Sequence, residues 1–227
     1  MAAGLAHEID QPLSAIVAYA SGSARRIRDG DIGVPALLEV VDSIADEALR
    51  AGEILRRIRD FVRHGEVSRS RADLNALVRE AVHFAEVEAR ELGIALRLAL
   101  APEPLAVEVD GIQVEQVILN LLRNGLDAMS EAPTGQHELL VQTRGQSEST
   151  VEVSVRDTGV GMSPATGERI FDPFFTTKVG GLGMGLSISR SIIEAHGGRL
   201  WATRNPDRGM TFSFTLPVRQ RDEIRAA

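Results

Sequence analysis

The sequence contains no cysteine, and this absence excludes disulfide bonds, thiolate zinc sites and cysteine nucleophiles. No apolar run approaches the roughly 20 residues of a membrane-spanning helix, and residues 1–6 lack the charged and apolar regions of a signal peptide. The formal net charge of -7 argues against nucleic acid as a partner, because such a protein needs a basic face. We therefore expect this chain to be cytoplasmic, with or without a membrane anchor elsewhere in its parent protein.

Lysine is almost absent as well, because 24 of the 25 basic residues are arginine and the one lysine is Lys178. Apolar residues make up 44% and charged residues 25% of the 227 residues, as in ordinary soluble proteins of one or two domains. Lys178 lies in a glycine-rich loop before a predicted helix. A lysine delivers a compact point charge on a flexible stem, so this position favours a functional role over a chance remnant of the composition.

Residues 1–64 are predicted to form two antiparallel helices. In residues 1–28, apolar side chains recur every three or four positions and form one stripe. After a glycine-rich turn, the second helix begins at Pro35 and carries a strict heptad of apolar residues from Leu37 to Val62. Two helices with one apolar face each cannot bury that face alone, so we predict a homodimer held together by a four-helix bundle.

The rest of the chain is predicted to contain a polar linker over residues 65–73, a second domain over residues 74–219 and a tail over residues 220–227. The expected helices cover 74–91, 111–130 and 184–196, and the expected strands cover 94–100, 105–109, 138–144, 151–156, 199–204 and 210–217. This mixture predicts an α+β fold, an α/β sandwich in which helices cover one face of a mixed, mostly antiparallel sheet.

His7 is the first candidate for chemistry. At about 100° per residue it points away from the apolar stripe of its helix, which normally indicates a solvated surface residue. Two neighbours favour another interpretation: Glu8 can orient or deprotonate an imidazole, and Pro12 should kink the helix because it has no N–H for the Glu8 carbonyl. An exposed histidine beside an acid and a kink is typical of a presented nucleophile.

Two further groups of residues suggest ligand binding. Asn120 and Asn124 lie one turn apart on a predicted helix, and amide oxygens are suitable Mg²⁺ ligands, although pairs of surface asparagines are common. Asp157 ends a predicted strand, and Gly159 and Gly161 allow a ligand to approach the backbone closely. A buried carboxylate there could accept a hydrogen bond from the exocyclic amine of adenine, but the residues alone fit an Asp-Thr-Gly turn equally well.

The loop over residues 176–186 has the pattern of a phosphate site. Gly181, Gly183 and Gly185 stand at alternate positions, which frees backbone N–H groups to face an anion, and the following helix offers its positive N-terminus. Lys178 adds a full positive charge to the same loop. We interpret the phenylalanines that precede it as the anchor of a mobile lid.

Taken in order, these segments resemble the sensor histidine kinases of two-component signalling. The run that begins at His7-Glu8 resembles the phosphoacceptor box, and Gly209-Met210-Thr211-Phe212 resembles the last box of the family, near the adenine. The segments between them resemble the N, G1, F and G2 boxes, in the order Asn120–Asn124, Asp157–Gly161, Phe171–Phe175 and Gly181–Gly185. The resemblance implies a bacterial protein with a histidine-phosphotransfer hairpin and a Bergerat-type ATP-binding domain.

The resemblance also implies roles for these residues. His7 would attack the γ-phosphate of ATP, Glu8 would handle its proton, and the phosphoryl group would pass to an aspartate of a response-regulator receiver domain. Asn124 would hold Mg²⁺ and Lys178 would contact the terminal phosphates. The full nucleotide-binding set implied in this way is Asn120, Asn124, Asp157, Gly159, Gly161, Lys178, Gly181, Gly183, Gly185 and Thr211.

The sequence departs from the family pattern at several positions. Asp10 stands where the subgroup often has asparagine, and Gln11 stands where many relatives have a threonine or asparagine for dephosphorylating the partner, which argues against phosphatase activity. Gly125 replaces a usual alanine inside a helix, at a cost of about 0.5–1 kcal/mol. Only six residues precede His7, so we expect a sensor domain upstream in the parent protein.

Two other functions are to be weighed against a histidine kinase. An ATPase of the same nucleotide-binding superfamily would place a glutamate four residues before the metal-binding asparagine; this chain has Asn120 there, which cannot act as a base. A non-catalytic dimer scaffold predicts a damaged nucleotide site, whereas every nucleotide motif is present. The sequence does not identify the stimulus, the partner, or whether His7 is phosphorylated in cis or in trans.

Overall fold

The computed structural model describes residues 2–31, 33–62, 68–130, 132, 135, 137–147, 149–178 and 183–218, and the side chains at these positions except 2–10, 49–50, 53–62 and 165. The chain divides into two compact units, Met1–Glu66 and Val67–Ala227. None of the helices in the described part of the chain is long and apolar enough to cross a membrane.

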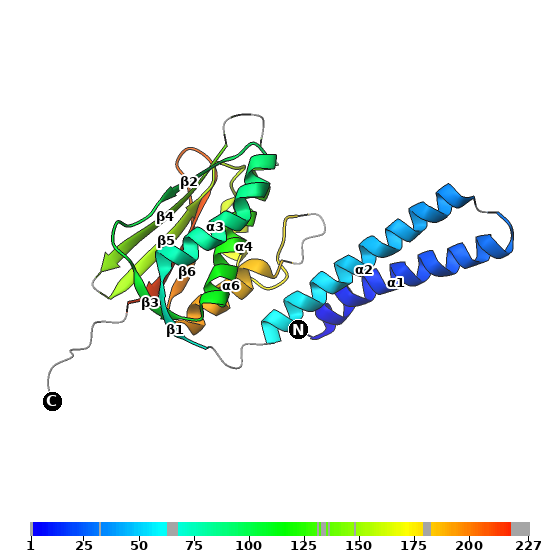
Figure 1. Cartoon of the computed structure of the whole chain (residues 1–227), viewed down its shortest axis with the longest axis horizontal. Coiled ribbons are helices and arrows are strands. Elements are labelled where there is room, and N and C mark those ends of the chain that lie inside the picture. Colours follow the sequence, from blue (N-terminus) through cyan, green and yellow to red (C-terminus); the bar gives the residue numbers. More distant parts are fainter. Residues whose placement is uncertain are drawn as a thin grey trace. The chain divides into compact units, whose positions relative to one another are not determined.

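The first unit contains two long helices, α1 (Ala2–Arg28) and α2 (Val34–Val62), which pack against each other as an antiparallel hairpin (Figure 1). Both predicted helices are confirmed. The turn between them is closed by backbone bonds at the end of α1, where the Asp31 N–H donates to the Arg26 carbonyl at 2.9 Å. The Arg26 guanidinium in turn donates to the Asp31 carbonyl at 3.0 Å. Asp31 thus supplies a partner to the Arg26 carbonyl, which lies in the last turn of α1, where carbonyls lack partners within the helix.

The hairpin leaves many apolar side chains exposed. Of the thirteen exposed large hydrophobic side chains among the described residues, seven lie on α1 and α2, namely Leu13, Val17, Tyr19, Ile27, Val34, Leu38 and Val41. Val41 belongs to the predicted heptad and is 51% exposed. A two-helix hairpin therefore buries only part of its apolar surface, as the sequence pattern predicts.

The second unit is built on a five-stranded sheet with the order β2-β4-β5-β7-β6. The strands are β2 (Ala95–Ala99), β4 (Glu138–Ser147), β5 (Thr150–Arg156), β6 (Arg199–Arg204) and β7 (Met210–Pro217). β2 pairs with β4 in parallel, and the other three pairings are antiparallel. The prediction of a mixed, mostly antiparallel sheet is confirmed.

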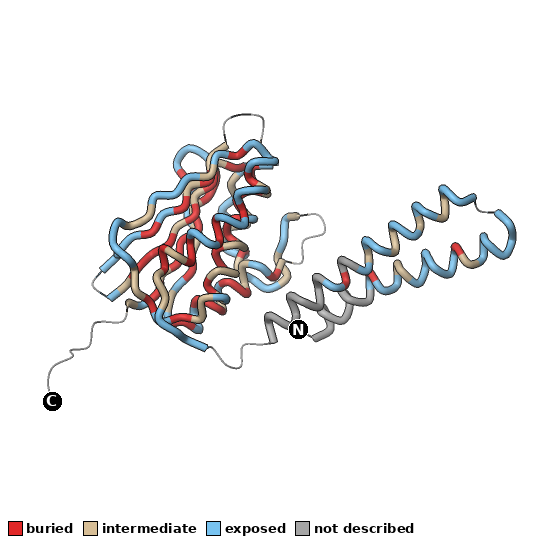
Figure 2. Tube along the Cα trace, in the orientation of Figure 1, coloured by how far each residue is buried: buried red, intermediate tan, exposed pale blue. Residues whose placement is uncertain are grey.

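One face of this sheet is covered by three helices, α3 (Leu74–Glu91), α4 (Gly111–Ser130) and α6 (Gly185–Ala195), as Figure 1 shows. Buried residues fill the space between the helices and the sheet (Figure 2). Alternate residues of β4 supply this layer: Leu139, Val141 and Thr143 are buried, whereas the residues between them are not. This alternation of buried and less buried residues explains why the strand could be predicted from the sequence.

Two elements differ from the sequence-based prediction. The prediction of a linker is wrong for residues 70–73, because β1 (Ser70–Asp73) pairs antiparallel with β3 (Ala106–Val109). Its four residues are too few to show a period of two, and the charged residues Arg71 and Asp73 are typical of a polar linker. Asp73 also caps α3, since its carboxylate accepts the Asn75 N–H. A short helix, α5 (Pro164–Arg169), was not predicted at all; it is capped by Ser163.

His196 fixes the end of α6 to the start of α4. It is buried, its Nδ1 lies 2.8 Å from the Ile192 carbonyl, and its Nε2 accepts the Asp110 N–H at 3.0 Å. Asp110 caps α4 through its carboxylate, which accepts the Gln113 N–H. An imidazole with its proton on Nδ1 satisfies both contacts, so His196 holds the end of α6 against the start of α4.

Candidate functional site

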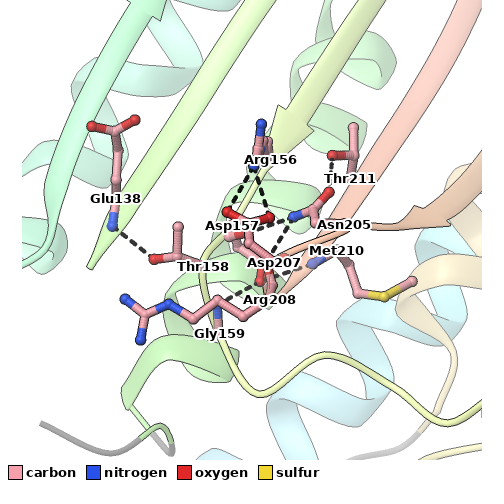
Figure 3. A network of polar contacts seen from close by, with 10 residues as sticks. All are labelled: Glu138, Arg156, Asp157, Thr158, Gly159, Asn205, Asp207, Arg208, Met210 and Thr211. Carbon is pink, nitrogen blue, oxygen red and sulfur yellow. Dashed lines mark hydrogen bonds and ion pairs between the residues drawn. The ribbon is translucent and has the colours of Figure 1, made fainter. Parts of the chain in front are cut away.

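Asp157 directly follows β5 and is 2% exposed. Its Oδ1 accepts the backbone N–H of Gly159 at 2.9 Å and that of Met210 at 3.2 Å (Figure 3). Burial raises the pKa of this carboxyl above its ordinary value, and the two backbone hydrogen bonds partly offset that effect. Both bonds go to one oxygen, and the described residues donate none to Oδ2. The second oxygen is therefore available to a ligand.

Asn205 holds the turn between β6 and β7 against Asp157, and it was not predicted as a site residue. Its amide nitrogen donates to the carbonyls of Asp157 at 2.9 Å and Arg208 at 3.1 Å, and its Oδ1 accepts the Thr211 hydroxyl at 2.7 Å (Figure 3). Asn205 is 7% exposed. An asparagine in an Asn-Pro-Asp turn is an ordinary turn residue, so only the structure connects it to the carboxylate. Thr211, a predicted site residue, acts here through Asn205.

Replacing Asn205 by alanine should destabilise the domain by about 1–3 kcal/mol, because it leaves buried polar groups without partners, and should also weaken nucleotide binding through displacement of Asp157. Chemical denaturation and calorimetry measure the two effects. The matched control is Asp207→Ala in the same turn, which removes an exposed carboxylate with its ion pair to Arg156 and its contacts to backbone N–H groups of the turn, and which should have a much smaller effect on both measurements. Equal effects of the two substitutions would refute the role of Asn205.

The predicted helix pair Asn120 and Asn124 lies on α4, but the two side chains have different surroundings. Asn120 donates to the Ser189 hydroxyl on α6 at 3.0 Å, and a Cβ on Gly185 would lie 2.5 Å from the Asn120 oxygen. A side chain at position 185 would therefore displace the Asn120 amide. Asn124 accepts the Lys178 ammonium on its Oδ1 at 3.2 Å, and its Nδ2 is buried without a partner among the described residues.

Lys178 reaches α4 from the segment before α6. Its Nζ also contacts Asp127 Oδ2 at 2.5 Å, and the two side chains are 37% and 46% exposed. Its own backbone N–H donates to the Thr176 hydroxyl at 3.1 Å. Asp127 was not predicted as a site residue, although it stands three residues after Asn124, on the same helix face.

The phenylalanines of the same segment are half-buried. The Arg169 guanidinium lies 4.4 Å from the centre of the Phe175 ring, and the Arg190 guanidinium lies 5.5 Å from that of Phe171, both within the range of a cation–π contact. Phe174 has a positive φ of 66°, which is rare for a residue with a bulky side chain and indicates local strain. These contacts tie the segment to α5 and α6.

The α4 helix brings the predicted residues together. A Cβ on Gly125 would lie 3.5 Å from the Asp157 Cβ, and one on Gly159 would lie 2.6 Å from the Ala128 carbonyl. The loop that carries Asp157, Gly159 and Gly161 therefore packs on the same helix as the Asn124–Lys178 contact. Gly183 and Gly185 stand at the start of α6. The side chains of His7 and Glu8, and residue Gly181, lie outside the described residues.

Two protein-family models match this chain, and one of them covers the α4 helix with its two amides. The model of the His Kinase A (phospho-acceptor) domain matches residues 1–67, and that of the histidine kinase-, DNA gyrase B- and HSP90-like ATPases matches residues 109–220. The catalytic domain of the histidine kinase ThkA is 33% identical, with a TM-score of 0.60 over 66% of this chain and 96% of that one. The chain belongs to the sensor histidine kinases.

Similarity to this family extends over nearly the whole chain. The sensor protein FixL of Bradyrhizobium diazoefficiens is 45% identical over 96% of the chain, and the C4-dicarboxylate transport sensor protein DctS of Rhodobacter capsulatus is 37% identical over 97%. The chain spans 43% of the first relative and 33% of the second. A structure of ThkA in complex with the response regulator TrrA matches 98% of the chain with a TM-score of 0.75 and 28% identity, and the chain covers 62% of that one.

Proposed function

We propose that this chain binds ATP with Mg²⁺, phosphorylates His7 and passes the phosphoryl group to an aspartate of a response-regulator receiver domain. The observation that carries the proposal is the buried carboxylate of Asp157, which has one oxygen bound by backbone N–H groups and the other without a donor among the described residues. An acceptor of this kind suits the exocyclic amine of adenine. Membership of the sensor histidine kinases supports ATP as the substrate.

Asn124 is the residue that would hold Mg²⁺. Its Oδ1 already accepts a cation, the Lys178 ammonium, while its Nδ2 has no partner among the described residues. Neutral amide oxygens are hard ligands of the kind that Mg²⁺ accepts alongside nucleotide phosphates and waters. The metal, when bound, would neutralise charge on the phosphates. Lys178 would supply a second positive charge there.

The chemical step uses α1. We propose that a nitrogen of the neutral His7 imidazole forms a bond to the γ-phosphorus while the bond to the β,γ-bridging oxygen breaks, and ADP leaves with that electron pair. Glu8 takes or stabilises the ring proton, a task that typically contributes 10²–10⁴-fold, as an order of magnitude. These roles rest on the sequence motif within α1, because the two side chains are outside the described residues.

Hydrolysis of ATP is the competing function, and the surroundings of Asn120 disfavour it. The Asn120 side chain donates to Ser189 and abuts Gly185, and an amide cannot accept a proton from water. Incubation with γ-labelled ATP and Mg²⁺ separates the two functions. A histidine kinase leaves a label on the protein that survives base and is lost in acid. Release of free phosphate without protein-bound label would favour an ATPase.

The partners are part of the same proposal. The response regulator follows from the ThkA relative, which is seen in complex with the regulator TrrA. The family model of the phospho-acceptor domain and the exposed apolar residues of α1 and α2 support a homodimer through the hairpin. We propose a further sensor domain in the parent protein, since this chain spans less than half of FixL and DctS.

The substitution Val41→Glu should break the proposed dimer. Val41 lies in the predicted heptad and is 51% exposed in the single chain, so Val41→Glu would place a charge in the predicted bundle core. Light scattering should find twice the chain mass of 24.5 kDa for the wild type and the mass of one chain for the variant. The control is Ala18→Glu, which lies on the side of α1 opposite the apolar stripe and is exposed. A dimeric Val41→Glu variant would contradict the bundle.

A further inference from the structure

The contact between Lys178 and Asp127 has no role in the function proposed so far. We propose that Asp127 is a positioning residue for Lys178. Its carboxylate binds the ammonium beside the Asn124 side chain. We call this contact between Lys178, Asp127 and Asn124 the clasp, and the ammonium must leave it when the metal and nucleotide bind. The inference rests on the proposed nucleotide site, but the clasp itself can be tested without nucleotide.

The geometry of α4 creates the clasp. Asn124 and Asp127 are three residues apart, so their side chains leave the helix on one face. Both accept the same ammonium, Asp127 Oδ2 at 2.5 Å and Asn124 Oδ1 at 3.2 Å. Asp127 forms no other ion pair with the described residues. The contact also ties the segment around Thr176 to α4, because the Lys178 N–H donates to the Thr176 hydroxyl.

Lys178 in turn determines how the Asn124 amide is oriented. The Asn124 nitrogen is buried and has no partner among the described residues, so only the contact at its oxygen fixes which way the amide points. Asp127 therefore acts on Asn124 through Lys178, by keeping a cation at the oxygen that faces the proposed metal position.

The clasped arrangement and the metal-bound one exclude each other. An ammonium at 3.2 Å from Asn124 Oδ1 and a divalent cation bound to the same oxygen would repel strongly at this distance. When metal binds, Lys178 has to move, and the phosphates are the anions that it can move to. Binding of MgATP thus exchanges one lysine–carboxylate pair for a lysine–phosphate pair, and the strength of the clasp lowers the apparent affinity for MgATP.

A double-mutant cycle tests this exchange. Asp127→Ala should raise the affinity for MgATP about two- to five-fold, since a half-exposed ion pair contributes about 0.4–1 kcal/mol. In a Lys178→Gln background the same substitution should leave the affinity unchanged, because no clasp remains to be broken. Calorimetry measures all four proteins. The matched control is Glu194→Gln, which breaks a comparable exposed pair with Arg190 on α6 and should change neither affinity.

The outcomes of the cycle distinguish the clasp from a direct repulsion between the Asp127 carboxylate and the phosphates. An equal gain from Asp127→Ala in both backgrounds would show that the carboxylate simply repels the phosphates, and it would overturn the proposal. No gain in either background would overturn it too. Failure of the wild type to bind MgATP at all would instead remove the proposed function.

The single lysine of the chain gives a direct readout of the clasp in the absence of nucleotide. Protein labelled with ¹³C at the lysine Cε shows one methylene signal, which belongs to Lys178. We expect the two Hε protons to be inequivalent in the wild type and to merge, as in a free lysine, in Asp127→Ala. Glu194→Gln should give the wild-type signal. A wild-type signal already equal to that of free lysine, or one that Asp127→Ala leaves unchanged, would contradict the clasp.

Discussion

Replacing His7 by glutamine is expected to remove all protein-bound label after incubation with γ-labelled ATP and Mg²⁺. His7 is the only histidine of the chain that stands beside an acid and before a proline inside a helix. Glutamine keeps a polar side chain of similar size but has no nucleophilic ring nitrogen. The loss should therefore be complete, whereas ATP binding, the fold and the dimer should persist. Gel autoradiography of the neutral or alkaline sample measures the label.

The matched control for this substitution is His83→Gln. The His83 side chain is 82% exposed and lies beside Glu86 on α3, so it is as accessible as any surface histidine. It lacks the proline that follows His7, and the phospho-acceptor family model ends at residue 67. We expect His83→Gln to label like the wild type. Retention of label in His7→Gln would show that the phosphoacceptor is a different residue.

Replacing Asp157 by asparagine is expected to weaken ATP binding by at least about 100-fold. The variant can keep Oδ1 as acceptor for Gly159 and Met210, which places its NH₂ group where Oδ2 stood. A donor then faces the adenine amine, so a favourable bond is lost and two donors oppose each other. Losing a charge-assisted hydrogen bond and leaving a buried donor unpaired together cost about 3 kcal/mol or more, and about 1.4 kcal/mol is tenfold.

Nucleotide specificity provides the control for Asp157. Inosine triphosphate carries a carbonyl oxygen in place of the adenine amine, so the asparagine variant should bind it better than ATP, whereas the wild type should prefer ATP. Calorimetry with the two nucleotides measures this reversal. Unchanged affinity for ATP in the variant would refute the assignment of Asp157, and an equal loss for both nucleotides would indicate a damaged pocket.

Asp157→Asn should weaken ATP binding but should stabilise the folded domain relative to the wild type as the pH rises. Burial raises the pKa of Asp157 above its ordinary value of 3.8, so its ionised form is less favourable in the folded domain than in the unfolded chain. Its contribution to stability is present below the ordinary pKa and is lost as the pH rises through the raised folded-state pKa. Asparagine has no such loss. The Tm of Asp157→Asn relative to the wild type should therefore rise as the pH increases from the ordinary carboxyl pKa of 3.8 through the raised folded-state pKa.

Most elements of the fold could be predicted because each presents its own period. The apolar stripe of α4 and the alternation along β4 extend over enough residues to define a helix and a strand. By contrast β1 has four residues and α5 has six, too few for a period to emerge. Their positions depend on partners far away in sequence, such as β3 for β1.

Site residues could be predicted where a local motif requires one residue type. They could not be predicted where the role of a residue depends on contacts with residues far away in the sequence. Asp157 and Gly159 stand in a motif, and the structure shows the close packing that excludes any side chain at Gly159. Asn205 and Asp127 are common surface types in ordinary sequence contexts. Their roles come from contacts over 48 and 51 residues of sequence, which no local pattern reveals. The sequence predicts a cost in helix stability at Gly125, whereas the structure shows the Leu139 methyl group 2.6 Å from where a Cβ would be.

The most direct test of the proposed function is to locate the phosphate on the protein. After incubation of the wild-type chain with MgATP, digestion and mass spectrometry under alkaline conditions should find one phosphoryl group on the peptide that contains His7 and none on peptides that contain the other four histidines. Addition of a cognate receiver domain should empty this site as the receiver becomes labelled. A phosphate on another residue, or an unmodified His7 in a chain that binds MgATP and dimerises, would contradict the account.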